Sequence, residues 1–233
     1  CHTANNDICD SSTDRDGPEH NGLSDFGREV VDEMNRLGIM VDVSHMSDKA
    51  FYDVLEVSKA PVIASHSNVR AICDHPRNLD DEMLKALAAK GGVIQLCLVN
   101  DYVARLDPNP RRDSARQALR LKYGRYEDID DSTRVLMINE WYALDNDFPA
   151  RLATVSQFVD HVDHITGLIG IDHIGFGSDF DGGSGIEGCY DVSQLPNITA
   201  EMLRRGYSRK DLQKFWGGNF LRVMKEVEKA ASS

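Results

Sequence analysis

The sequence predicts an α/β fold with a parallel sheet, because apolar runs and amphipathic segments follow one another along the chain. Four runs, "IMVDVS", "VIAS", "VIQLCL" and "HIGFGS", are apolar almost throughout. Strands that are buried on both faces of a parallel sheet read this way, whereas half-exposed strands alternate apolar and polar residues. Helical segments separate the runs, and this order is typical of βα units.

The elements are expected in a regular order. Residues 1–24 are polar and predict an irregular loop around the turn cluster "DGPEHNG". Residues 24–37 predict an amphipathic helix that begins at Ser24 as N-cap and stops at Gly38. Its apolar face is expected to carry Phe26, Val30, Met34 and Leu37. Further helices are expected at about 48–58, 80–90 and 152–169, with a loop and two helices after the last strand.

Residues 104–150 interrupt this order. The segment is charged, contains three prolines and two aromatic clusters, and predicts a mostly helical insertion. A parallel barrel of eight βα units takes about 250 residues, and the insertion and loops use up part of the 233 present here. We therefore expect residues 1–233 to form the C-terminal half to two-thirds of a single (β/α)8 barrel domain of the TIM type.

The charge balance excludes one class of partner. The chain carries 26 Lys and Arg against 38 Asp and Glu, a net charge of −12, whereas a nucleic-acid-binding protein needs a basic surface. No apolar run approaches the ~20 residues of a membrane-spanning helix. Five scattered cysteines form no CxxC pair and do not indicate a redox compartment. The opening Cys-His-Thr has neither an initiator Met nor a signal-peptide pattern, and we expect further sequence upstream.

Three residues that can bind metal or transfer protons lie at the C-terminal ends of predicted strands. They are His45, His66 and Asp179. Such residues meet at one edge of a parallel sheet, where α/β enzymes carry their active sites. Imidazole suits zinc, and a carboxylate can bind it or handle protons. One histidine at a strand end is as often a hydrogen-bonded loop residue, so it is the coincidence of three that favours a metal hydrolase.

The remaining histidines receive structural interpretations. His161 and His164 lie three residues apart on a predicted helix without the Glu of a zincin motif, so we expect them at the core or its boundary. His173 lies at the wrong end of its strand. His20 and His75 lie in polar loops, where we expect them to be solvated.

Three long blocks carry a resemblance to a known family. "NGLSDFGREVVDEMNRLGIMVDVSH", "APVIASHSNVRAICDHPRN" and "GFGSDFDGG" resemble the membrane (renal) dipeptidases, zinc peptidase family M19. The resemblance runs from His2 to about Glu228, apart from residues 104–150. It implies a (β/α)8 barrel with two zinc ions at its C-terminal face, joined by a bridging carboxylate and a bridging water. It further implies dipeptide hydrolysis by a metal-bridging hydroxide, and pairing of two copies as a homodimer.

The resemblance also assigns roles to individual positions. His45 and His66 match the two histidines that bind the second zinc. Asp179 matches the acidic residue beside the bridging water, which would act as general acid and base. The side chains that would contact the substrate are His2 at the scissile carbonyl, Arg77 of "HPRN" at the C-terminal carboxylate, Asp179 and Tyr102.

Part of the family's metal site has no counterpart in this sequence. The first zinc is held by a His-x-Asp pair on the first strand, and the bridging ligand is a glutamate on the third. We expect a missing N-terminal segment of the same protein to supply them. Two alternatives remain open: an inactive barrel remnant that acts as a binding protein, and an N-terminal-nucleophile hydrolase that uses Cys1. The second alternative requires layered antiparallel sheets, which the βα order contradicts.

Overall fold

The computed structural model describes residues 1–149 and 151–231. The chain forms two compact units, one of residues 1–105 and 153–233 and the other of residues 106–152. Within the described ranges, no helix is both long enough and apolar enough to cross a membrane.

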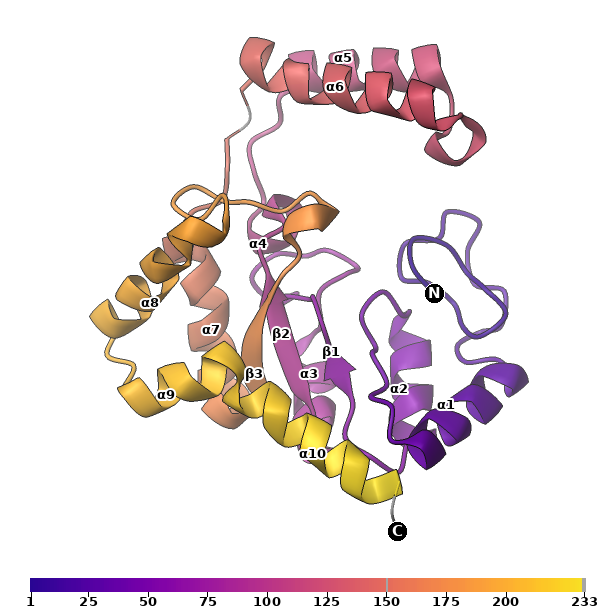
Figure 1. The fold of residues 1–233 in the computed structure, drawn as a ribbon, viewed down its shortest axis with the longest axis vertical. Helices are drawn as coiled ribbons and strands as arrows, with labels where there is room; N and C mark the ends of the chain where they lie inside the picture. The colour runs from indigo at the N-terminus through magenta and orange to yellow at the C-terminus, as the bar shows by residue number, and fades with distance from the viewer. Residues whose placement is uncertain (150, 232–233) are drawn as a thin grey trace. The chain divides into compact units, whose positions relative to one another are not determined.

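A three-stranded parallel sheet lies at the centre of the larger unit (Figure 1). Ile94 of the middle strand pairs with Ile174 of the last, and both side chains are fully buried. The parallel sheet among helices confirms the predicted α/β class. A closed eight-stranded barrel is not formed by the described residues and stays a prediction. In sheet order, the strands are β1 (Ile63–Ala64), β2 (Val93–Cys97) and β3 (Ile174–Ser178).

The strand expected at residues 39–44 is reduced to a single bridge beside β1. Asp42 pairs in parallel with Ile63. Two backbone hydrogen bonds hold the segment there, from Val43 N to Ile63 O (2.8 Å) and from Ile63 N to Val41 O (3.0 Å). Just beyond β1, Ser65 N donates to the side chain of Asp42 (3.0 Å) and not to a backbone oxygen, so the ladder does not extend. The apolar run therefore predicted the place of this segment but not its regular pairing.

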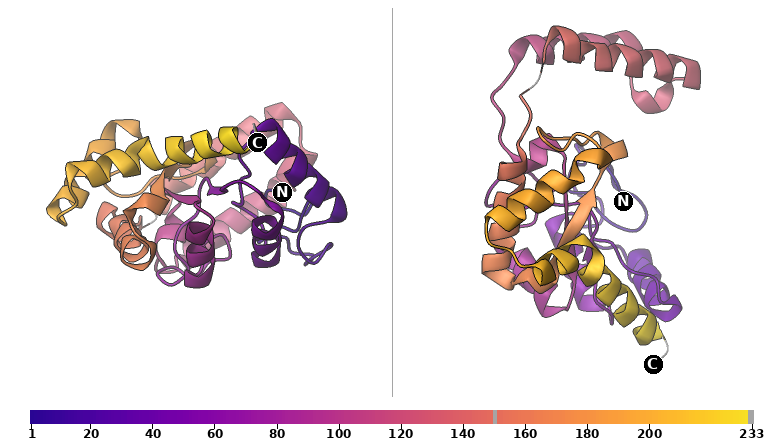
Figure 2. Two further views of the ribbon diagram at one scale, coloured as in Figure 1. Left: turned by 90° about the horizontal axis from the view of Figure 1, so that it is seen from below. Right: turned by 60° about the vertical axis from the view of Figure 1, so that its left-hand side comes forward.

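Helices cover both sides of the sheet. α2, α3 and α7 stand along one side, and α10 runs across the other (Figures 1 and 2). The helices of this unit are α1 (Asp25–Leu37), α2 (Asp48–Val57), α3 (Asp81–Ala89), α4 (Asn100–Val103), α7 (Val155–Ile169), α8 (Leu195–Arg204), α9 (Arg209–Gln213) and α10 (Asn219–Ala231), with short turns η2 (Ile171–His173), η3 (Phe180–Gly182), η4 (Val192–Gln194) and the π turn η5 (Lys214–Gly218).

The start of β1 and β2 packs against α10. Ala60, Ile63 and Val93 form a buried cluster with Val223 and Val227 of that helix. α10 thus covers the amino ends of the strands, whereas the candidate site residues follow their carboxyl ends. The chain was expected to end in two helices after the last loop, but a third short one, α9, joins α10 through η5.

Helix α1 buries a different face from the one predicted. Ser24 caps it by accepting a hydrogen bond from Gly27 N, and Gly38 ends it at φ 70°. Phe26 and Leu37 are 55% and 53% exposed, however, while Gly27, Val31 and Asn35 are buried. Gly27 lies so close to the loop that an added Cβ would stand 2.2 Å from Ile8 O. The pattern of apolar residues missed this because the helix buries a glycine and an asparagine.

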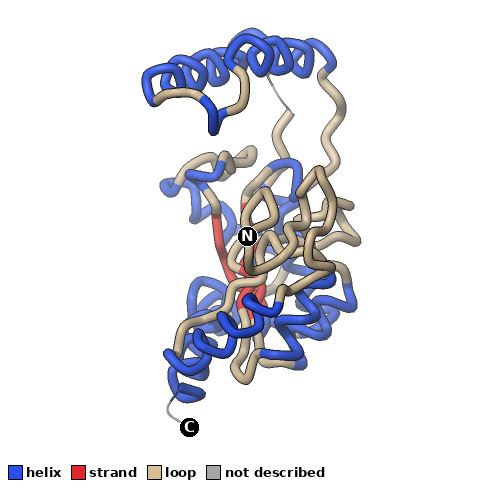
Figure 3. Tube along the Cα trace, turned by 90° about the vertical axis from the view of Figure 1, so that its right-hand side faces the viewer, coloured by secondary structure: helices blue, strands red, loops and turns tan. Residues whose placement is uncertain are grey.

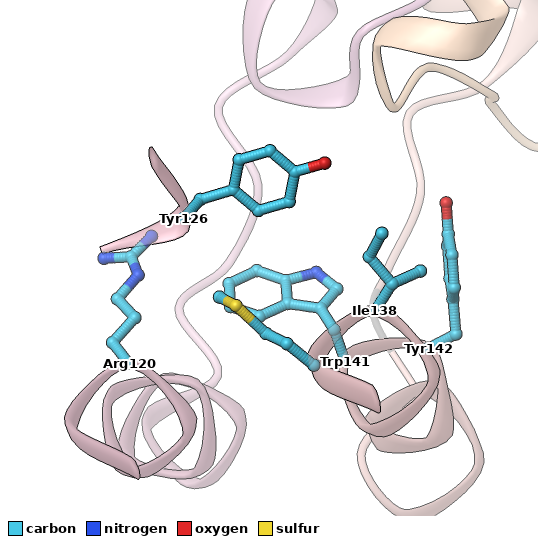
Figure 4. A pocket seen from close by; sticks show the side chains of 6 residues that line it. Arg120, Tyr126, Ile138, Trp141 and Tyr142 are labelled. Carbon is cyan, nitrogen blue, oxygen red and sulfur yellow. The ribbon is translucent and has the colours of Figure 1, made fainter. Parts of the chain in front are cut away.

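The smaller unit is a pair of helices. α5 (Pro110–Tyr123) and α6 (Asp131–Asp147) are joined through the turn η1 (Tyr126–Asp128). Lys122 of α5 forms an ion pair with Glu140 of α6 (2.6 Å). An aromatic cavity of about 280 Å³ lies between these elements (Figure 4). Its lining residues are Arg120, Tyr126, Met137, Ile138, Trp141 and Tyr142.

Candidate metal and substrate site

Two imidazoles converge beyond the carboxyl ends of neighbouring segments. His45 follows the extended segment beside β1, His66 follows β1 itself, and their Nε2 atoms lie 2.9 Å apart. His45 has a left-handed backbone, with φ 72°, which is uncommon for a residue with a side chain and reverses the chain here. Its carbonyl oxygen accepts a hydrogen bond from Ser12 N (2.8 Å), which joins this turn to the N-terminal loop.

A serine and a carboxylate orient the His66 ring. Ser65 Oγ lies 2.5 Å from Asp42 Oδ2 and 2.7 Å from His66 Nδ1. Because a carboxylate can only accept, the hydroxyl donates to Asp42, and its oxygen is left to accept from Nδ1–H of His66. His66 therefore presents a bare Nε2 lone pair, which is the form that binds a metal ion. Sequence reasoning missed Asp42 and Ser65, whose only signals are a carboxylate inside an apolar run and a serine beside a candidate ligand.

Burial keeps both imidazoles neutral. It lowers the pKa of His45 to about 3, and the positive charge of Arg77 adds to the effect. Burial likewise lowers the pKa of His66, again with a contribution from Arg77, while the carboxylate of Asp179 opposes that shift. Nδ1 of His45 is buried and has no hydrogen-bonding partner among the described residues. The ring is thus uncharged and can offer a lone pair to a cation.

Arg77 places a buried guanidinium next to the histidines. Arg77 is only 3% exposed, and its Nη2 donates a hydrogen bond to His66 O (3.0 Å). Nε of Arg77 is buried and without a partner among the described residues. The guanidinium carbon lies 5.6 Å from the centre of the Tyr102 ring. Burial lowers the pKa of Arg77, because a cation that is removed from water loses its hydration. The guanidinium still has an N–H group that could donate to an anion.

His75 supports this arrangement instead of being solvated as predicted. Its Nδ1 accepts a hydrogen bond from the backbone N of Arg77 (3.1 Å), and its ring lies against the Tyr102 ring at 4.4 Å between centroids. The imidazole and the phenol thus form one wall beside the guanidinium.

Asp179 and His2 lie at the margin of the site. Asp179 follows β3 with φ 67°, and a Cβ at Gly182 would lie 2.2 Å from its Oδ1, so that glycine leaves room for the carboxylate. Asp179 is half-buried and acts on His66 through its charge. His2 is exposed, and its ring centroid lies 4.2 Å from that of His45.

The described part of the chain shows no fuller metal site. No group of three or more His, Cys, Asp or Glu side chains in residues 1–149 and 151–231 could hold a metal ion. The two imidazoles fit zinc in their chemistry, because both are neutral and their Nε2 atoms lie 2.9 Å apart. Zinc takes about four ligands, so they account for part of a coordination shell only.

The other histidines have structural roles. His161 is fully buried, as predicted, between Val69 N (3.1 Å) and Val103 O (2.8 Å). His164 pairs with Asp81 at 2.7 Å. The remaining two histidines bind backbone oxygens. His173 Nδ1 lies 2.9 Å from Gly92 O, and His20 Nε2 lies 2.9 Å from Asn6 O.

Comparison with known sequences gives a consistent set of relatives. The family model described as "Membrane dipeptidase (Peptidase family M19)" matches residues 1–233. Dipeptidase tcpJ of Claviceps purpurea (strain 20.1) is 40% identical over 233 residues, which are 100% of this chain and 44% of that protein. Dipeptidase 3 of Homo sapiens is 38% identical over 209 residues, 89% of this chain and 34% of that protein. The chain thus spans less than half the length of these relatives.

Solved structures show the same likeness. The probable dipeptidase PvdM from Pseudomonas aeruginosa is similar with a TM-score of 0.80 and 35% identity, over 99% of this chain and 62% of that one. A metallo peptidase from Rhodobacter sphaeroides, liganded with a phosphinate mimic of the dipeptide L-Ala-D-Ala, has a TM-score of 0.68 and 28% identity. The match covers 89% of this chain and 48% of that one.

Proposed function

This chain belongs to the membrane dipeptidase family, peptidase family M19, and from that premise we propose that it forms part of a zinc-dependent dipeptidase. The observation that carries the proposal is a pair of neutral imidazoles, 2.9 Å apart, beside a buried guanidinium with an unpartnered Nε. A free dipeptide offers a peptide carbonyl and a C-terminal carboxylate close together. A metal-binding pair next to an anion-binding group matches both features.

His45 and His66 would hold one zinc ion through their lone pairs. Zinc, when bound, supplies Lewis acidity, which polarises a carbonyl and makes water acidic enough to lose a proton near neutral pH. Ser65 and Asp42 would keep the His66 ring in the tautomer that can bind. We propose that the remaining ligands, the His-x-Asp pair and the bridging Glu of the family's two-zinc site, come from polypeptide outside residues 1–233.

Arg77 would bind the C-terminal carboxylate of the dipeptide. The guanidinium has Nη2 committed to His66 O, while Nε is buried and free. A substrate carboxylate would supply the missing acceptor and a counter-charge in a water-poor position, where charge-assisted hydrogen bonds are strong. Tyr102 and His75 would fix the plane of the guanidinium from the side.

Asp179 and His2 would act on the scissile bond. The carboxylate of Asp179, whose charge acts on His66, can take a proton from the attacking water at an Oδ atom and return it to the leaving amine, as a general acid and base must. His2 would donate a hydrogen bond to the carbonyl oxygen as negative charge develops there. The contact of its ring with that of His45 supports this role.

We further propose that the parallel sheet is part of a (β/α)8 barrel. The order β1-β2-β3 and the segment beside β1 give consecutive parallel neighbours with helices between them. The candidate residues follow the carboxyl ends of these segments, where barrel enzymes carry their sites. A solved structure of the complete protein tests the number of strands.

The function is tested on the complete protein with free dipeptides as substrates. Hydrolysis should stop when a chelator removes the metal and return when zinc is added. Binding of dipeptides without hydrolysis would instead support the binding-protein alternative. Hydrolysis that survives the chelator but is lost in C1S would support the nucleophile alternative, although the parallel sheet already speaks against that fold.

A further inference from the structure

Two thiols lie side by side in the N-terminal loop, which is drawn without helix or strand in Figure 3. Cys1 Sγ and Cys9 Sγ are 3.1 Å apart. A disulfide has an S–S distance of about 2.05 Å, so a shift of about 1 Å would bring the two atoms to bonding distance. Among the described residues, the structure brings no other two thiols together; the other cysteines are Cys73, Cys97 and Cys189.

Hydrogen bonds on both sides hold this pair in register. Asn6 binds Cys9 twice, with its backbone N donating to Cys9 O (3.3 Å) and its Oδ1 accepting from Cys9 N (3.1 Å). Ser11 Oγ donates to the carbonyl oxygen of His2 (2.7 Å), which fixes the chain just after Cys1. Asp10 then anchors the turn by accepting from Glu19 N, His20 N and Gly22 N. The two sulfur atoms are therefore brought together by the fold of the loop.

We propose that Cys1 and Cys9 form a reversible disulfide by exchange with a small disulfide such as oxidised glutathione. Cys9 is fully buried, whereas Cys1 is half-buried and within reach of solvent. The pair also lies near the candidate metal site, because Cys1 Sγ donates a hydrogen bond to the backbone oxygen of His45 (3.8 Å) and Cys1 precedes His2, whose ring lies against that of His45.

The exchange balances in two steps. The Cys1 thiol loses its proton and attacks one sulfur of the small disulfide, forming a mixed disulfide and releasing one small thiol. The Cys9 thiol then loses its proton and attacks Cys1 Sγ, which breaks the mixed disulfide and releases the second small thiol. Two protein thiols are oxidised and one small disulfide is reduced to two thiols. An excess of small thiol reverses both steps.

The experiment exposes the folded protein to oxidised glutathione, blocks the remaining thiols with an alkylating reagent under denaturing conditions, and maps the products. Cleavage before Asp7 separates residues 1–6 from residues 7–9. The two pieces should stay linked after oxidation and separate on reduction. Three of the five cysteines should carry the alkyl group. C189S, which removes a buried thiol outside the loop, should behave like the wild type, and C9S should form no linkage.

Thermal unfolding gives a second readout. Closing a short loop constrains the unfolded chain, so oxidation should raise the melting temperature of the wild type and of C189S by a few degrees and leave C9S unchanged. Five alkylated cysteines after oxidation would overturn the proposal. So would a glutathione adduct that stays on Cys1, or a linkage that involves Cys73, Cys97 or Cys189.

Discussion

The Nε2 atoms of His45 and His66 lie 2.9 Å apart although 21 positions separate the residues. The two residues are brought together because the segment before His45 pairs in parallel with β1, and both segments end at the same edge of the sheet. Both rings are neutral at this edge, since burial lowers both pKa values.

H45A and H66A in the complete protein should each abolish dipeptide hydrolysis and remove about one zinc per chain, because either change leaves one imidazole for an ion that takes about four ligands. Metal analysis and a hydrolysis assay measure the two effects. H164A is the matched control, since His164 pairs with Asp81 instead of lying at the site. Full zinc content in both variants would show that these histidines are not ligands.

S65A should weaken zinc binding while leaving both candidate ligands in place. The variant removes the oxygen that accepts from His66 Nδ1, so the ring is free to rotate or change tautomer. Losses of about 10- to 100-fold in metal affinity are typical when such a supporting group is removed. Competition with a coloured chelator measures the affinity. S65T keeps the hydroxyl and should retain most of the zinc affinity. Equal losses of affinity in S65A and S65T would show that the Ser65 hydroxyl does not hold the His66 ring.

Local signals predicted the ends of the elements well. Ser24 as N-cap and Gly38 as the stop of α1 depend on neighbours within one turn, and the structure confirms both. The face that α1 buries depends on the loop it meets, so Val31 and Asn35 are buried where Phe26 and Leu37 were predicted to be. Asn35 is buried because its Oδ1 accepts hydrogen bonds from Lys59 N (2.6 Å) and Ala60 N (3.0 Å), far along the chain.

In the candidate site, too, local features could be predicted from the sequence, whereas contacts between distant segments could not. The strand-end positions of His45 and His66 could be read from the apolar runs that precede them. The support of His66 by Asp42 could not be read from the sequence. It depends on how the segment with Asp42 is aligned with β1, and a single bridge sets that alignment. The contact of His75 with Tyr102 likewise arises between two loops and leaves no trace in local composition.

R77K should raise KM for free dipeptides and leave zinc content unchanged. Lysine keeps the charge but loses the planar fork that can bind both oxygens of a carboxylate. The loss of one charge-assisted hydrogen bond corresponds to about a 10- to 100-fold rise in KM. Steady-state kinetics with free dipeptides and with dipeptide amides separate the cases. Amides should be poor substrates for the wild type and nearly insensitive to R77K; efficient cleavage of amides would rule out the clamp.

His161 should make folding stability depend on pH. Val69 N–H donates to its Nδ1 (3.1 Å), so the single ring proton is on Nε2, which donates to Val103 O (2.8 Å). A second proton would have to sit on Nδ1, facing an N–H group in a fully buried position. Burial accordingly lowers the pKa of His161 to about 4, against about 6.5 for an unfolded histidine.

The sign of the effect follows from proton binding. Between pH 6.5 and 4 the unfolded chain binds a proton at this residue and the folded chain does not, so acid favours unfolding. The stability that neutral His161 contributes is complete above about pH 6.5, falls as the pH drops, and changes little below about pH 4. The full difference is about 3 kcal/mol. Urea unfolding of wild type and H161Q at several pH values measures it, and His45 contributes equally to both proteins. H161Q should be less stable at neutral pH but should lose less stability on acidification; parallel curves for the two proteins would show that His161 is not held neutral.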